Sequence, residues 1–154
     1  MTPLNCAAIK GDFELLKILV EKGGANLEET SPKGCTALMY ASWGGNIDMV
    51  KYLLEKGVNF LKQDNSGGTA AHHAIEKGHS EVIQKMIDFS VDLDIPDNAG
   101  RTPLFESIEH NMITISRMLV SNGVWVNVAD FSGHSPLYCA VWDGNETITK
   151  ILVE

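Results

Sequence analysis

The stretch Thr102-Pro103-Leu104, with Asn111 nine residues after the threonine, decides the fold because the same pattern recurs along the whole chain. The corresponding triplets are Thr2-Pro3-Leu4, Thr36-Ala37-Leu38, Thr69-Ala70-Ala71, Thr102-Pro103-Leu104 and Ser135-Pro136-Leu137, at spacings of 34, 33, 33 and 33 residues. The residues nine positions after each leading hydroxyl residue are Gly11, Gly45, Gly78, Asn111 and Gly144. A fixed period of this length indicates an array of small structural repeats.

Each unit predicts two helices. Threonine or serine at the N-cap favours a helix start because its hydroxyl accepts a hydrogen bond from a free amide, and proline at the next position has no amide hydrogen to lose. Glycine or asparagine nine residues later favours a stop, since both adopt the left-handed conformation at low cost. A second helix follows, with apolar residues at helical spacing such as Ile47, Val50 and Leu54.

Each second helix is expected to end at a further marker, twenty-one residues after the hydroxyl residue. These markers are Gly23, Gly57, Ser90 and Gly123, with Gly24 as the extra residue of the first unit. Ser90 replaces a glycine and is expected to strain its loop. Asp-x-x-Gly signatures at 64–67, 97–100 and 130–133 then predict a turn before the next unit.

Composition narrows the class of protein. The 154 residues are 44% hydrophobic and carry a formal net charge of -8, which excludes disorder and disfavours wholesale attraction to nucleic acid or an anionic membrane. Cys6, Cys35 and Cys139 are too few and too scattered for a disulfide framework or a closely spaced zinc site. Neither a secretory signal nor an apolar run long enough to span a membrane is evident. We therefore expect a cytoplasmic or nuclear protein.

The units resemble the ankyrin repeat, whose pattern joins Asp-x-x-Gly-x-Thr-Pro-Leu-His to Ala-Ala, Gly-His, a leucine-rich helix and a Gly-Ala-Asp-Val-Asn loop. Good matches are Ala7-Ala8 with Gly11-Asp12, Leu53 to Asn59, and Lys77 to Val82. The resemblance implies an all-α repeat solenoid of stacked helix-turn-helix repeats joined by β-hairpin-like loops. It implies one domain, residues 1–154, with repeats at approximately 1–30, 31–63, 64–96, 97–129 and 130–154. The first and last repeats are incomplete, so we expect a fragment of a longer chain.

The residues that could bind a metal or catalyse a reaction have structural explanations. His72 falls at the family's structural histidine, and His79 falls in its Gly-His turn. We predict no metal and no cofactor, since zinc needs four converging ligands and no cysteine lies near these histidines in sequence. His73 and Glu106 occupy equivalent positions in adjacent repeats, and we expect them to form a structural polar pair.

The resemblance also implies a binding surface, because ankyrin partners usually lie on the concave side, against loop tips and the ends of the inner helices. The candidates carried over are Lys10, Trp43, Glu76, Lys77, Glu109, His110, Trp142 and Asp143 on the inner helices, and Lys33, Arg101, Phe131 and His134 on the loops. Trp43 and Trp142 stand where the family needs no large core residue, so we expect them, with Phe131, to anchor a partner. The basic candidates alternate with acidic ones, which argues against nucleic acid.

Two residues near the end of the fourth unit complete the prediction. Trp125 replaces the usual loop aspartate and either forms a second contact or covers the adjacent hairpin. Asn127 resembles the ankyrin asparagine that asparaginyl hydroxylase modifies, although the usual aspartate is missing. The predicted function is a monomeric, non-catalytic scaffold that binds a protein partner on its concave face, without membrane contact. The alternative is the regulatory or substrate-docking segment of a larger enzyme.

Overall fold

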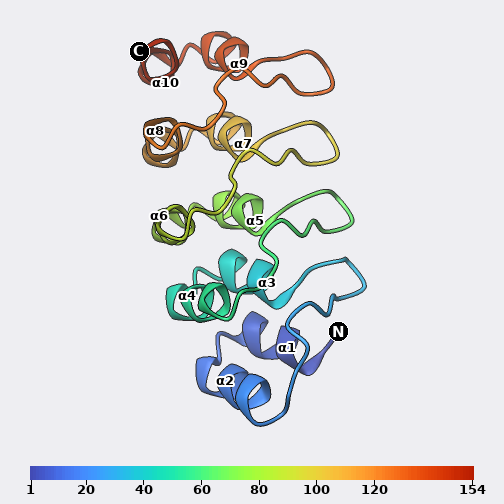
Figure 1. Cartoon of the computed structure of the whole chain (residues 1–154). Helices are drawn as coiled ribbons and strands as arrows, with labels where there is room; N and C mark the ends of the chain where they lie inside the picture. Colours follow the sequence, from blue (N-terminus) through green and yellow to red (C-terminus); the bar gives the residue numbers. More distant parts are fainter.

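Five helix pairs stack one upon another in the computed structural model, which describes every residue from Met1 to Glu154 and contains no strand (Figure 1). The first helices of the pairs are α1 (Pro3–Lys10), α3 (Ala37–Trp43), α5 (Ala70–Glu76), α7 (Pro103–Glu109) and α9 (Pro136–Trp142). The second helices are α2 (Phe13–Glu21), α4 (Ile47–Glu55), α6 (Ser80–Asp88), α8 (Ile113–Ser121) and α10 (Glu146–Val153). The predicted all-α repeat solenoid is confirmed.

The helices begin and end as the repeat predicts. The Thr102 hydroxyl accepts a hydrogen bond from the Phe105 amide at 3.2 Å, and its equivalents in the first, second and fifth repeats cap in the same way. Left-handed residues follow the first helices, including Asn111 with φ 56°. Ser90, with φ 53°, is left-handed after α6, as expected. The first repeat differs, because its left-handed residue after α2 is Gly24 and not Gly23.

The core lies between the two helix rows. Figure 1 shows α1, α3, α5, α7 and α9 in one row and the second helices in a parallel row, and contacts join successive members of each row. Leu4 and Leu104 are buried in the first row, and Leu53, Met86 and Leu119 are buried in the second. Burial of these side chains against neighbouring repeats supplies the stability that no isolated repeat has. No helix is long and apolar enough to span a membrane.

The loops that follow the second helices project from the far side of the first row (Figure 1). Each loop tip is a closed turn, as in the Asp64 amide donating to the Gly68 carbonyl at 2.9 Å. Successive tips are also joined, because the Asn98 amide donates to the Ser66 carbonyl at 3.0 Å. The loops thus have the hydrogen bonding of short hairpins without forming strands. The surface between these turns and the first helices is called the groove below.

Candidate functional site

The groove contains two adjoining depressions of different chemistry. The polar depression, about 470 Å³, is lined by Asp64, Ser66, Gly68, His72, His73, Glu76, Asp97, Asn98, Ala99, Arg101 and Glu106. The apolar depression, also about 470 Å³, is lined by Met1, Ile9, Lys33, Cys35, Met39, Tyr40, Trp43, His73 and Glu76. His73 and Glu76 belong to both depressions and form the ridge between them. The groove therefore combines an apolar surface with a carboxylate-rich one.

Trp43 lies in the apolar depression at the end of α3. Its side chain remains 43% exposed, and the Lys77 ammonium lies 4.9 Å from the centre of its ring. Ile9, from the preceding repeat, is also exposed in this depression. The structure thus brings three of the predicted binding residues together here, namely Lys33, Trp43 and Glu76.

Trp142 lies at the equivalent position at the end of α9 and is more exposed, at 77%. It belongs to a column of stacked rings, in which His134 and Tyr138 centroids are 4.7 Å apart and Tyr138 and Trp142 centroids are 6.0 Å apart. Tyr138 was not among the predicted binding residues, although its spacing of four residues from both His134 and Trp142 was the available signal. The fifth repeat thus presents an aromatic surface.

Phe131 lies at the tip of the last turn and is 80% exposed. One edge of its ring lies against Gly100 of the preceding turn, where an added Cβ would come within 2.6 Å of the Phe131 ring. The Phe131 amide donates to the Ala99 carbonyl at 2.9 Å. The ring is therefore held by its backbone and one edge while most of its surface faces solvent.

The charged candidates are largely paired with one another. Arg101 donates to Glu109 at 3.0 Å and to Asp97 at 2.8 and 3.0 Å, and Lys77 lies 3.0 Å from Glu76. Two of the four basic candidates are thus partly neutralised within the groove. The remaining charged or polar candidates are exposed, and they are Lys10, Lys33, His110, His134 and Asp143.

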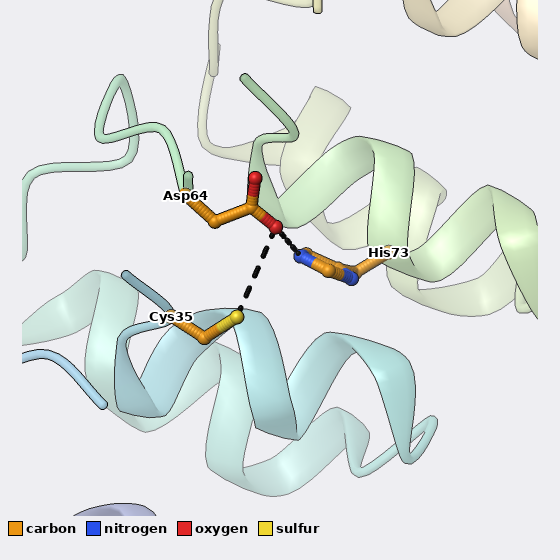
Figure 2. Close-up of side chains that lie close together, drawn as sticks. All are labelled: Cys35, Asp64 and His73. Carbon is orange, nitrogen blue, oxygen red and sulfur yellow. Dashed lines mark hydrogen bonds and ion pairs between the residues drawn. The ribbon is translucent and has the colours of Figure 1, made fainter. Parts of the chain in front are cut away.

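Asp64 lies at the start of the third repeat and forms side-chain contacts with Cys35, before α3, and with His73 on α5 (Figure 2). Its Oδ1 accepts hydrogen bonds from the Ser66 amide, the Ser66 hydroxyl and the Gly68 amide at 2.7 to 2.9 Å. Its Oδ2 accepts one from His73 Nε2 at 2.9 Å and one from the Cys35 thiol at 3.8 Å. Although burial raises the pKa of Asp64, the bonds from Ser66 and Gly68 hold it below its ordinary value.

One prediction about this region needs correction. His73 does not pair with Glu106, because the turn carboxylate of its own repeat, Asp64, lies within hydrogen-bond distance. No cysteine lies near His73 in sequence, but stacking of the repeats brings Cys35 of the second repeat close to His73 and Asp64. His72 and His79 do have the predicted structural contacts. His72 bonds Thr69 and the Arg101 carbonyl, and His79 bonds the Trp43 carbonyl.

Glu106 is the least satisfied polar group of the groove. Its Oε2 is buried without a hydrogen-bond partner in the chain. Burial is the main cause that raises the pKa of Glu106 to about 7, and it outweighs the opposing effects of His110 and Arg101. An unpartnered buried carboxyl is costly to the free chain, so Glu106 is suited to accept a donor from a bound molecule.

The two residues near the end of the fourth repeat lie outside the depressions. Trp125 is 69% exposed, and its amide donates to Asp94 Oδ1 at 2.8 Å. Asn127 is exposed in the same loop. Trp125 is therefore available as a comparison for the groove tryptophans, and hydroxylation of Asn127 stays a prediction.

The repeated helix pairs and the groove define a class of protein. A sequence model of the family described as ankyrin repeats (3 copies) matches residues 1–64 and 58–130. The chain therefore belongs to the ankyrin repeat family. Ankyrin repeats are generally protein-interaction modules and are typically non-catalytic.

Segments of several larger proteins are similar to this chain. Ankyrin repeat and SAM domain-containing protein 6 of Rattus norvegicus is 42% identical over 66 residues, which are 43% of this chain and 8% of that protein. NAD-capped RNA hydrolase NUDT12 of Homo sapiens is 42% identical over 57 residues, 37% of this chain and 12% of that protein. Potassium channel AKT1 of Arabidopsis thaliana is 46% identical over 63 residues, 40% of this chain and 7% of that protein. The chain thus spans a small part of each relative.

Proposed function

We propose that this chain is a non-catalytic scaffold that binds a protein partner along the groove, with Trp43, Trp142 and Phe131 as anchors. The exposure of two tryptophans at equivalent helix ends, three repeats apart, carries this proposal. Large aromatic side chains bury about 150–250 Å² each when covered, and such residues dominate the binding energy of many interfaces. Their position on rigid helices favours a partner that meets a preformed surface.

The apolar depression specifies one part of the partner. Trp43 and Ile9 expose apolar surface beside Tyr40, and these side chains come from two adjacent repeats. A partner side chain inserted between them would remove apolar surface from water on both sides. We therefore infer an aliphatic or aromatic residue of the partner at this position.

The polar depression specifies a second part. Its lining includes four carboxylates, Asp64, Glu76, Asp97 and Glu106, against one guanidinium, that of Arg101. Glu106 Oε2 still lacks a hydrogen bond there. A lysine or arginine of the partner would satisfy that oxygen and reduce the excess of negative charge. The inferred partner segment thus carries a basic residue between two apolar contacts.

The experiment begins with capture of a partner by the wild-type chain, followed by affinity measurements with purified proteins. We expect Trp43→Ala and Trp142→Ala each to lower the affinity by more than about tenfold, since buried interface aromatics often contribute 2 kcal/mol or more. Glu106→Gln is expected to weaken binding by less than the tryptophan variants do, because glutamine keeps the size of the side chain and loses only its charge.

Trp125→Ala is the matched control, because this tryptophan is exposed but lies outside the groove depressions. It should leave the affinity unchanged. Equal affinities of the wild-type chain and the Trp43→Ala, Trp142→Ala double variant would contradict the proposal. So would a loss of affinity in the control as large as that in the groove variants.

A second candidate function is a docking or regulatory segment of a larger enzyme. The similarity to a segment of NAD-capped RNA hydrolase NUDT12 supports it, since the matched part is 12% of that protein. The coding sequence on both sides of the chain distinguishes the two candidates. A flanking catalytic domain would favour the second, and its absence would favour the scaffold.

A further inference from the structure

Three side chains with metal-binding atoms converge at the junction of the second and third repeats. Cys35 precedes α3, Asp64 begins the next turn and His73 lies on α5, and Figure 2 shows all three directed toward one point. Their sulfur, oxygen and nitrogen atoms lie within 4.8 Å of one another. This cluster lies on the ridge of the groove and involves none of the aromatic anchors.

The cluster is held in place by surrounding groups. The three hydrogen bonds to Asp64 Oδ1 fix the carboxylate so that Oδ2 faces Cys35 and His73. Glu76 Oε2 lies 4.0 Å from His73 Nδ1, which is too long for a hydrogen bond. The cluster therefore has three candidate ligands, of which Asp64 is held in place by its own turn.

We propose that Cys35, Asp64 and His73 bind one Zn²⁺ ion. A thiolate, a carboxylate and an imidazole are all ligands that zinc accepts, whereas magnesium and calcium prefer oxygen alone. Loss of the thiol proton on binding gives two ligand negative charges, which balance the charge of the ion. Three protein ligands leave the fourth tetrahedral position for water, as in open zinc sites.

The distances suit this ion after small adjustments. Zinc bonds of about 2.0–2.3 Å at tetrahedral angles place ligand atoms about 3.3–3.6 Å apart. The observed separations are 2.9 Å between Asp64 Oδ2 and His73 Nε2 and 3.8 Å between Asp64 Oδ2 and Cys35 Sγ. The remaining pair, Cys35 and His73, lies within 4.8 Å, so changes of about 1 Å in side-chain position convert the hydrogen-bonded cluster into a coordinated one.

The same geometry disfavours a catalytic cysteine. The Cys35 thiol donates to the Asp64 carboxylate and not to the His73 imidazole, which is itself bonded to Asp64. Burial together with that carboxylate raises the pKa of the thiol. Activation of a cysteine requires a base or a positive charge beside it. Zinc supplies that positive charge, and it would join the second repeat to the third at the ridge of the groove.

The test is a titration of the chelator-treated, reduced chain with Zn²⁺ in competition with a chromophoric chelator. The wild-type chain should bind one equivalent. Cys35→Ser and His73→Gln should each lower the affinity by at least about tenfold, since even loss of a supporting group costs that much in known sites. Co²⁺ should show a thiolate charge-transfer band that disappears in Cys35→Ser.

Cys139→Ser is the matched control, because it changes the same residue type in the fifth repeat. It should retain wild-type zinc affinity, and circular dichroism establishes that every variant is folded. Binding of less than one equivalent by the wild-type chain would overturn the proposal. Unchanged affinity in Cys35→Ser or His73→Gln would overturn it as well, and either variant suffices if the other fails to fold.

Discussion

The third and fourth repeats open with turns that share one half of their hydrogen bonding and differ in the other half. Oδ1 of Asp64 and Oδ1 of Asp97 each accept the amides two and four residues ahead, at 2.8 and 2.9 Å in both turns. Oδ2 of Asp97 is bound by the Arg101 guanidinium, whereas Oδ2 of Asp64 is bound by His73 and Cys35. The Asp97 carboxylate is bound within its own turn, whereas the Asp64 carboxylate is bound by a histidine of the following helix and by a cysteine of the preceding repeat.

A single register position accounts for this difference. The residue before the helix-capping threonine is Arg101 in the fourth repeat and Gly68 in the third. Arginine at this position reaches back to its own turn, and glycine has no side chain with which to do so. A turn carboxylate with no partner of its own is therefore available to residues of the preceding repeat, here Cys35.

The same comparison explains the two polar residues in the middle of the first helices. His73 forms a hydrogen bond with Asp64. Its equivalent in the next repeat, Glu106, faces a turn whose carboxylate, Asp97, is already paired with Arg101. Two carboxylates cannot share a hydrogen bond unless one is protonated. Glu106 is consequently left with a buried oxygen and a pKa raised to about 7, mainly by burial.

The largest expected effect is on the pH dependence of stability. The pKa of Glu106 is raised from 4.5 to about 7, so the folded chain keeps a proton that the unfolded chain loses over this range. Stability therefore falls as pH rises from about 4.5 to 7, by about 3 kcal/mol, and is fully present only below this window.

Glu106→Gln should remove this fall, as measured by urea unfolding at several pH values. Glu81→Gln, which removes an exposed carboxylate on α6, is the matched control for the loss of one carboxylate. An equal slope in the wild-type chain and Glu106→Gln would show that the groove does not perturb Glu106.

The next effect is on the proposed zinc site. Gly68→Arg gives the third turn the residue that binds the carboxylate of the fourth. Gly68 does not have a positive φ, and an added Cβ would lie 3.3 Å from Asp64 Oδ2, a tight contact that requires a small shift of that carboxylate. The guanidinium should bind Asp64 and lower zinc affinity by at least about tenfold, comparable with loss of a supporting group. If folded Gly68→Arg keeps the zinc affinity of the wild-type chain, Asp64 is not a zinc ligand.

A smaller effect is expected when the fourth turn loses its internal partner. Arg101→Ala removes the two-pronged contact to Asp97 and the bond to Glu109, and should lower stability by about 1 kcal/mol because the pair is partly solvent-screened. Lys150→Ala, which breaks an exposed pair on α10, should have little effect. Equal losses in the two variants would indicate that Arg101 is an ordinary surface residue.

The smallest effects concern left-handed residues, where the two repeats differ again. The residue after the second helix is Ser90 in the third repeat and Gly123 in the fourth, and both have positive φ. Ser90→Gly should raise the free energy of unfolding by about 0.5 kcal/mol, because the relief of left-handed strain is partly offset by the greater entropy of glycine in the unfolded chain.

Asn111→Gly tests the left-handed residue after the first helix, which is asparagine in the fourth repeat and Gly78 in the third. The gain should be smaller, because asparagine tolerates this conformation and the Asn111 side chain accepts a bond from Asn145 at 2.6 Å. Urea unfolding of the two variants measures both values, and a larger gain for Asn111→Gly would contradict the explanation.

The fold could be predicted because its determinants are local and periodic. Hydroxyl caps such as Thr102, and stops such as Asn111, act within one or two helical turns of their own position. Gly23 was predicted to be the left-handed residue after α2, but Gly24 has that conformation. The pattern could not distinguish the two, because the inserted residue can be assigned to either glycine of the pair. Local patterns thus decide helix boundaries to within a residue.

The candidate site could be predicted only in part. The equivalence of Trp43 and Trp142 followed from the period, and both are exposed as expected. The cluster of Cys35, Asp64 and His73 was missed, because Cys35 and Asp64 are 29 residues apart and meet only when repeats stack. Register alone suggested that His73 faces Glu106, but a carboxylate nine residues earlier in the same repeat competes for the imidazole.

The central claim is that a protein partner binds in the groove, and hydrogen exchange of the captured complex tests it most directly. Binding should protect amides in the loop tips and at the ends of α3, α5, α7 and α9, including peptides that contain Trp43, Phe131 and Trp142. Amides of α4, α6 and α8 should exchange as in the free chain. Protection confined to those second helices, with unchanged exchange in the groove peptides, would contradict the account.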